Sequence, residues 1–244
     1  MKVTVIGPWG GYPAKDGASA CYVVEKDDFV LVVDFGSAAL SKLQKYYDVP
    51  DIDAVIISHY HADHIADIGV FQHARVVYAH VAGQDDLLPI YGHMENKAEF
   101  DKLTHDYTEG KPYHPKEALQ VGPFTITFLQ TKHSVPCYGM RITDGETTIV
   151  YTADTAYQDE WINFAEGADL LIADCNFYAG QNAAEAGHMT STEGAMIAQQ
   201  AKVKELLQSH LPQFGNWQQL VEEAKEVYSG PIHLAREGFV WESN

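Results

Sequence analysis

The segment Ala54-Val55-Ile56-Ile57-Ser58-His59-Tyr60-His61-Ala62-Asp63-His64 joins an apolar, strand-like run to an H-x-H-x-D-H cluster. Four side chains that can bind a metal stand within six residues, a density that single core or surface histidines do not produce. Imidazole and carboxylate groups are ligands that suit zinc, and no thiolate is needed beside them. The segment therefore predicts a metal centre directly after a strand.

The spacing within the cluster divides it between two metals. His59 and His61 lie two positions apart, so at the end of a strand they project to the same side. Asp63 and His64 follow on the turn that opens a helix expected over residues 65–72. We expect the first pair to serve one metal and the turn residues to serve the other.

Three further candidate ligands, His133, Asp154 and His210, stand at the ends of later strand-like runs. His133 would complete the site of the first two histidines, and His210 would complete the site of the turn residues. Asp154 is the natural bridge, because a carboxylate has two oxygens and can hold two cations about 4 Å apart. A water shared by two metals has a pKa low enough to ionise near neutrality.

These motifs resemble the metallo-β-lactamase superfamily and, within it, the ribonuclease Z and related phosphodiesterase branch. The H-x-H-x-D-H cluster is highly specific for the superfamily, and the resemblance extends from Met1 to the region around His210. The branch is indicated by three segments, Leu171–Asp174, Gly187–Thr190 and Ser209–Pro212. The resemblance implies an α/β (α+β) fold, a four-layer αβ/βα sandwich. It also implies two Zn²⁺ per chain, with Mn²⁺ or Fe²⁺ as substitutes.

The same resemblance assigns catalytic roles outside the metal ligands. In ribonuclease Z a glutamate and a histidine deliver a proton to the leaving group, and the matching positions here are Asp174 and His188. The carboxylate is shorter by one methylene, and Ala173 stands where the family usually has another histidine. A carboxylate–imidazole pair suits general-acid catalysis, because the carboxylate sets the tautomer and stabilises the imidazolium. The alternative for Asp174 and His188 is a structural role. Among the metal ligands, Asp63 is expected to help orient the attacking hydroxide.

Two departures from the ribonuclease Z pattern indicate a small substrate. Enzymes that process tRNA usually carry an extruded basic arm between the motifs of Asp154 and Asp174, and residues 155–173 leave no room for it. The chain has 16 Lys and Arg against 34 Asp and Glu, a net charge of −18, whereas polynucleotide affinity comes largely from basic side chains. We therefore expect a small phosphodiester or a short nucleic acid as substrate, and poor cleavage of precursor tRNA.

Other functions stay open at this point. The runner-up is a lactone, thioester or β-lactam hydrolase on the same dinuclear site, a branch with little use for the Asp174 and His188 pair. A redox enzyme is a third class, but its iron-bearing relatives often carry an acidic residue where this chain has His61. A non-enzymatic scaffold is least expected, because no ligand position is missing. The fold alone does not separate these functions.

The length suits one domain over residues 1–244. Helices are expected over 65–72, from a capping box at Thr190 to Ala201, and over 217–228. The stretch 80–118 is expected to be an insertion with a short helix near 95–103, or a lid over the metals that also pairs with a second subunit. Strands are expected at 3–6, 21–25, 30–34, 54–57, 76–78, 124–129, 139–143, 148–151, 170–173 and 205–207.

Cysteine usage and hydropathy indicate the compartment. The three cysteines, Cys21, Cys137 and Cys175, lie far apart without a C-x-x-C pair and are interpreted as reduced core thiols of a cytoplasmic protein. There is no run of 18 apolar residues and no signal-like start. We expect no membrane segment. The sequence does not determine the oligomeric state, and a homodimer is the alternative to a monomer.

Overall fold

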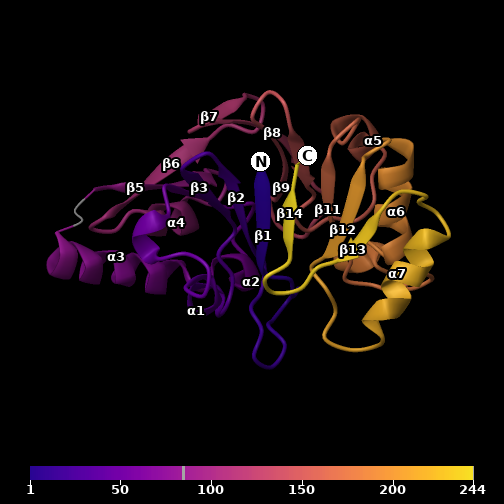
Figure 1. The fold of residues 1–244 in the computed structure, drawn as a ribbon, viewed down its shortest axis with the longest axis horizontal. Helices are drawn as coiled ribbons and strands as arrows, with labels where there is room; N and C mark the ends of the chain where they lie inside the picture. Colours follow the sequence, from indigo (N-terminus) through magenta and orange to yellow (C-terminus); the bar gives the residue numbers. More distant parts are fainter. Residues whose placement is uncertain (84–85, 244) are drawn as a thin grey trace. The chain divides into compact units, whose positions relative to one another are not determined.

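The computed structural model describes residues 1–83 and 86–243, and the chain divides into two compact units. Unit 1 comprises Met1–His114 and Arg236–Glu242, and unit 2 comprises Pro115–Ala235. Each unit contains one seven-stranded mixed sheet with helices beside it (Figure 1). The α/β class expected from the sequence is confirmed.

The sheet of unit 1 has the order β14-β1-β2-β3-β4-β5-β6. Its neighbours from β14 to β3 are antiparallel, and those from β3 to β6 are parallel. The parallel half matters for function, because side chains that follow its strands emerge at one edge. The strands are β1 Lys2–Gly7, β2 Cys21–Lys26, β3 Phe29–Val33, β4 Ala54–Ile56, β5 Leu88–His93, β6 Thr108–Tyr113 and β14 Val240–Glu242.

The helices of unit 1 bury apolar side chains against this sheet. Leu43 of α1 and Phe71 of α3 are fully buried in one cluster with Val32 and Val55 of the strands. Removing this apolar surface from water stabilises the arrangement of strand and helix. The helical segments are α1 Ala39–Leu43, α2 Ala62–Ile65, α3 Ile68–Ala82 and α4 Lys97–Phe100, with short 3₁₀ turns at Val49–Asp51 and Asp101–Leu103.

The sheet of unit 2 has the order β13-β12-β11-β10-β9-β8-β7. Strands β10 to β13 run parallel to one another, and β7 to β10 are antiparallel neighbours. The central parallel strands are buried and rich in branched apolar residues, as parallel strands usually are. The strands are β7 Leu119–Val121, β8 Phe124–Gln130, β9 Tyr138–Thr143, β10 Thr148–Tyr151, β11 Leu170–Asp174, β12 Glu205–Ser209 and β13 Ile232–Leu234.

Three helices, α5 Glu160–Phe164, α6 Ser191–Gln200 and α7 Trp217–Lys225, lie beside strands β11 to β13 of unit 2 (Figure 1). The predicted capping box is present, since the Thr190 side chain accepts from the Glu193 N–H and the Glu193 carboxylate accepts from the Thr190 N–H. A 3₁₀ turn, Ala184–Ala186, precedes α6. The helix expected at 190–201 is therefore confirmed, and the helix expected at 217–228 is present but ends at Lys225.

The strand expected at residues 76–78 is wrong, because this segment lies inside α3. The branched residues Val76 and Val77 favour a strand locally, but burial of Ile68, Phe71 and Arg75 follows the helical period. Tertiary burial thus overrides local propensity. The helix expected over 65–72 is also divided, because α2 ends at Ile65 and α3 begins at Ile68.

The stretch 80–118 contributes two strands to the sheet of unit 1. Strands β5 and β6 pair in parallel from Leu88↔Thr108 to His93↔Tyr113, so much of the stretch is part of the sheet. The short helix expected near 95–103 is present as α4 and the 3₁₀ turn that follows it. Residues 84 and 85 of this stretch lie outside the described residues, and a lid role for the remainder stays a prediction.

The three cysteines are buried and form no disulfide. Burial, with nearby carboxylates, raises the pKa of the Cys21 and Cys175 thiols well above its usual range, so both stay protonated. They are core thiols, as expected. Within residues 1–83 and 86–243, the structure has no helix with the length and apolar character needed to cross a bilayer.

Candidate metal centre

In unit 1, three imidazoles gather directly after β4. His61 is the N-cap of α2, and His64 lies within that short helix. The ring centroids of His59 and His61 are 4.7 Å apart, and those of His59 and His64 are 4.1 Å apart. The short spacing of strand, turn and helix therefore brings the cluster together within one unit, as the sequence predicts.

Asp34 accepts hydrogen bonds from residues of this cluster and was not identified as a site residue from the sequence. It follows β3, and its carboxylate accepts hydrogen bonds from the Ser58 backbone N at 2.7 Å, the Ser58 Oγ at 2.8 Å and the His64 Nδ1 at 2.7 Å. The only local signal was an aspartate in the turn Asp34-Phe35-Gly36 at a strand end.

The hydrogen bonds to Asp34 determine which nitrogen each histidine presents. Ser58 has one hydroxyl proton, which it donates to Asp34, so its Oγ accepts from the His59 Nδ1 at 3.0 Å. His64 likewise donates through Nδ1. Both rings therefore keep the lone pair on Nε2, and this is how residues behind a metal usually orient histidine ligands.

Asp63 is fixed from a different part of unit 1. The Gly11 N–H donates to its Oδ2 at 2.7 Å, and Gly11 has a φ of 69°, which favours glycine. The same oxygen lies 3.5 Å from the His64 Nε2. Gly36 allows α2 to approach, because a Cβ there would lie 2.0 Å from the Asp63 carbonyl oxygen.

In unit 2, the candidate ligands emerge at one edge of the sheet. Asp174 ends β11, while Asp154 and His210 follow its neighbours β10 and β12, and these strands are parallel. Side chains beyond the carboxyl ends of parallel strands meet at the same edge. The His210 Nε2 is 3.2 Å from the Asp154 Oδ1, and the His133 Nε2 is 3.7 Å from its Oδ2. Each oxygen of Asp154 therefore faces a different histidine, as a bridging ligand requires.

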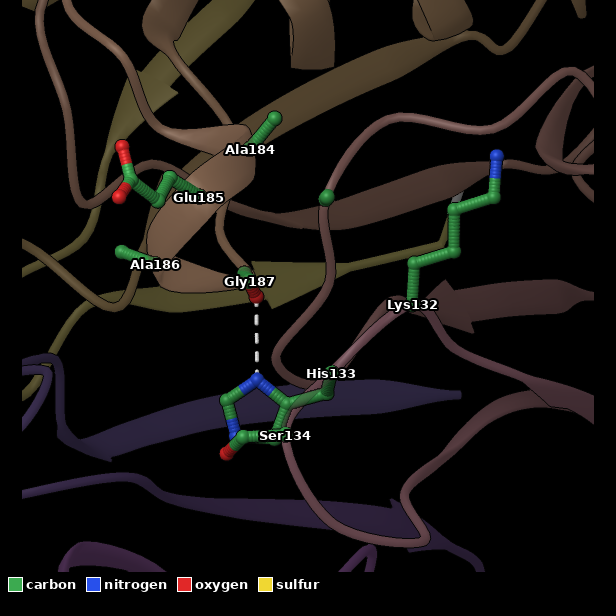
Figure 2. Close-up of a pocket in the computed structure, with 8 residues that line it drawn as sticks. Lys132, His133, Ser134, Ala184, Glu185, Ala186 and Gly187 are labelled. Carbon is green, nitrogen blue, oxygen red and sulfur yellow. Dashed lines mark hydrogen bonds between the residues drawn. The ribbon is translucent and has the colours of Figure 1, made fainter.

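The ring of His133 is oriented by the loop before α6. Its Nδ1 donates to the Gly187 carbonyl oxygen at 3.0 Å, which Figure 2 shows as a dashed line. The ring therefore keeps its lone pair on Nε2, the atom that faces Asp154. Gly187, with a φ of 77°, leaves space for this contact, because a Cβ there would lie 2.9 Å from the His133 Nδ1.

Asp174 and His188 form the pair that the sequence predicted. The His188 Nδ1 donates to the Asp174 Oδ2 at 2.8 Å, and the Thr155 N–H donates to the same oxygen at 3.1 Å. Burial alone would raise the pKa of the Asp174 carboxyl, but the charge and hydrogen bonds of His188 and then His210 lower it overall. Burial opposes the charged form of His188, and the Asp174 carboxylate outweighs burial and raises the pKa of the imidazole.

The donor set of unit 2 fits a divalent metal. Asp34 and Asp63 are buried in unit 1, and Asp154 and Asp174 are buried in unit 2. Buried carboxylates need compensating positive charge, and a cation supplies it. In unit 2, Asp154, Asp174, His188 and His210 each offer one ligand atom, and these atoms lie within 4.8 Å of one another. Nitrogen and oxygen donors of this kind suit zinc.

Three residues at or beside these donors have a strained backbone. The φ values of Asp34, Ala153 and His210 are 58°, 52° and 54°, all in the left-handed region. Such conformations are costly for residues with a Cβ and persist where the surrounding structure enforces them. Each of the three residues lies at or beside a turn that follows a strand, so the strained turns direct the polar side chains.

Comparison with known proteins identifies the family. Residues 32–211 match the model of the beta-lactamase superfamily domain. A probable metallo-hydrolase, YhfI of Bacillus subtilis, is 52% identical over 243 residues, covering 99% of this chain and 100% of the relative. The crystal structure of YhfI superposes with a TM-score of 0.98 at 53% identity and covers 99% of each chain.

More distant solved structures share the fold. The short form of human tRNase Z has a TM-score of 0.80 at 18% identity and covers 99% of both chains. A diphosphatase of the PhnP family has a TM-score of 0.78 at 18% identity, with coverage of 100% of this chain and 98% of the other. The expected fold is thereby confirmed. The chain belongs to the metallo-β-lactamase superfamily, as a metallo-hydrolase.

Proposed function

We propose that the protein is a zinc-dependent phosphodiesterase that acts on a small phosphodiester or a short nucleic acid. The observation that carries this proposal is the 2.8 Å hydrogen bond between His188 and Asp174, beside the candidate ligands Asp154 and His210. Phosphodiester cleavage releases an alkoxide that needs a proton, and a carboxylate-supported imidazole can donate one. The net charge of −18 favours a small substrate over a structured RNA.

Seven residues are proposed to hold two Zn²⁺. Asp154 would bridge the metals, which is supported by its two oxygens facing different histidines. The family match over residues 32–211 includes every proposed ligand. Bound zinc would supply Lewis acidity and a water that ionises near neutrality. The remaining ligands are His59, His61 and His133 for one metal, and Asp63, His64 and His210 for the other.

The protein's own groups then have distinct tasks. Asp63, held by the Gly11 N–H, orients the attacking water. His188 donates a proton to the departing oxygen from Nε2, because its Nδ1 is engaged with Asp174. Asp174 sets the tautomer of His188 and stabilises its protonated form. The Thr155 N–H and the Asn176 N–H hold the Asp174 carboxylate in place for this task.

The test is metal analysis of the purified protein together with activity on matched phosphodiester, lactone and thioester substrates. We expect two zinc ions per chain and the highest kcat/KM on phosphodiesters. Precursor tRNA should be a poor substrate. A preference for lactones or thioesters would instead establish the alternative hydrolase class. Efficient, salt-sensitive cleavage at a tRNA 3′ end would contradict the small-substrate proposal.

We also propose a homodimer formed through helix α3. Val70, Val77 and Val81 of this helix are 57%, 47% and 83% exposed. The helix contains no Asp, Glu or Lys, and its single Arg75 is buried. In a chain with a net charge of −18, copies repel one another least where a face has no carboxylate. Val77→Glu should lower the mass measured by light scattering from dimer to monomer, and a monomeric parent protein would contradict the proposal.

A cytoplasmic location is proposed from the thiols. Cys21, Cys137 and Cys175 are buried and unbridged, and this suits a reducing compartment. Cell fractionation with an antibody to the protein tests this location.

A further inference from the structure

A pocket of about 410 Å³ opens in unit 2 beside the candidate ligand His133 (Figure 2). Lys132 and Ser134, the sequence neighbours of His133, line the pocket on one side. The 3₁₀ turn Ala184–Ala186 lines it from another segment. Its size suits a small chemical group next to the proposed reaction centre. None of the groups proposed for the reaction except His133 lines this pocket, so its chemistry is still to be explained.

Lys132 is the basic residue of this pocket. Its backbone is held on both sides, because its N–H donates to the Thr155 Oγ1 at 3.3 Å and its carbonyl accepts from the Ala156 N–H at 2.9 Å. Its side chain is exposed, and no carboxylate among residues 1–83 and 86–243 forms an ion pair with its ammonium. The backbone of Lys132 is thus fixed beside the candidate ligand His133, while its exposed side chain is available to a ligand.

The acidic residue of the pocket does not neutralise Lys132. Glu185 accepts a hydrogen bond from the Asn182 Nδ2 at 2.7 Å. Figure 2 shows the Glu185 carboxylate directed away from Lys132. The small side chains Ala156, Ala184 and Ala186 complete the lining and leave the space to a ligand.

We propose that Lys132 is a specificity-determining residue that binds a second anionic group, a phosphate monoester, on the substrate. This inference rests on the proposed phosphodiesterase function and names its substrate class: small phosphodiesters that carry a further terminal phosphate. The scissile phosphate lies at the metal ligands, and the terminal phosphate enters the pocket beside His133. In a chain with a net charge of −18, a local cation is needed to attract such an anion.

The binding test uses thymidine 3′,5′-bisphosphate and thymidine 5′-monophosphate as probes on the zinc-loaded protein, measured by calorimetry. The parent protein should bind the bisphosphate more tightly. Lys132→Ala should reduce this preference about tenfold, which is the scale of one hydrogen bond to a charged group, and Lys132→Arg should retain most of it. Lys225→Ala removes an exposed lysine from α7 of the same unit and should leave the preference unchanged. Added salt should weaken the preference.

Equal loss of preference in the Lys132→Ala and Lys225→Ala proteins, or no loss in either, would overturn the inference. Hydrolysis of thymidine 5′-(p-nitrophenyl phosphate) tests the proposed phosphodiesterase function separately from the phosphate pocket. A parent protein that cleaves this diester, combined with an unchanged bisphosphate preference in Lys132→Ala, refutes only the phosphate pocket. A parent protein that fails to cleave it, yet shows the Lys132-dependent preference, refutes the phosphodiesterase and retains an anion site.

Discussion

The two units assemble their candidate metal-binding side chains in opposite ways. Unit 1 takes its candidates from six consecutive residues, His59 to His64, after a single strand. Unit 2 takes its candidates from positions 133 to 210, after four different strands. The first group depends on local geometry and one carboxylate behind it, whereas the second depends on the register of a sheet.

The register of unit 2 is specified by pairings such as Ile149↔Leu170 and Leu170↔Glu205. A slip by one residue would turn every side chain to the opposite face of the sheet, and the carboxyl-end groups would no longer meet. In unit 1 the equivalent control is a set of hydrogen bonds to Asp34. A substitution at the candidate site of unit 1 should therefore change only the local geometry. A substitution that disturbs the sheet register of unit 2 should also lower the stability of the fold.

The largest effect is expected from Asp63→Ala in unit 1. Loss of this carboxylate removes a proposed ligand and the group that orients water, so turnover should nearly vanish. The decrease in kcat should exceed the roughly 10–100-fold loss typical of residues behind the ligands. Steady-state kinetics with metal analysis measures it, and circular dichroism checks that the fold is kept. A mild decrease would show that Asp63 is not a ligand.

His188→Ala tests the chemistry of unit 2 and should leave the metal content intact. With an alkoxide leaving group the rate should fall by roughly 10²–10⁴-fold, because the general acid is lost. With a nitrophenolate, which departs without a proton, the decrease should be far smaller. Asp174→Asn should show the same pattern in milder form, since it changes the orientation and charge environment of the imidazole. Equal losses on both substrates, or loss of metal, would mean that His188 is structural or a ligand.

Asp34→Asn examines the hydrogen-bond control of unit 1. The substitution removes the charge that receives the His64 and Ser58 hydrogen bonds, so zinc affinity should fall by roughly 10–100-fold. Competition with a chromogenic chelator measures the affinity. We expect the thermal midpoint of the zinc-free protein to change little. Unchanged zinc affinity would show that the orientation of the ligands does not depend on Asp34.

Thr190→Ala should have the smallest effect and falls in unit 2. It removes the N-cap of α6, whose loss typically costs about 1 kcal/mol. Urea unfolding measures the free energy, and zinc content at saturating metal should be unchanged. Asn216→Ala, at the N-cap of α7, is a matched substitution because its side chain also accepts from a backbone N–H. A large loss of zinc at Thr190→Ala would link α6 directly to the geometry of the site.

The sequence could predict the elements whose signals are local. Strands β1 to β4 and β8 to β12 were predicted because their apolar, branched runs end at turn residues. Strands β5 and β6 were missed because Pro89, Gly92, Gly110 and Pro112 are unusual within strands. Pro112 is tolerated because β6 is an edge strand. At Gly92 a Cβ would lie 2.4 Å from the Tyr60 hydroxyl, so the missing side chain allows close packing.

Asp34 shows the corresponding difference at the site. Its partners Ser58 and His64 lie 24 and 30 residues away, so nothing near it in sequence distinguishes it from an ordinary turn aspartate. The same applies to the Gly11 N–H, which reaches Asp63 from 52 residues away. Contacts of this range exist only after the sheet has formed.

The sequence by itself determined the types of candidate ligand, the family resemblance and the grouping of His59 to His64, because strand and turn periodicity acts over a few residues. Only the tertiary structure decided which atoms face one another. Parallel pairing of β10, β11 and β12 brings Asp154, Asp174 and His210 to one edge. The hydrogen bonds that His64 and His133 donate from Nδ1 direct each Nε2 toward a carboxylate. The physical reason is that strand register and buried hydrogen bonds are long-range properties of the folded chain.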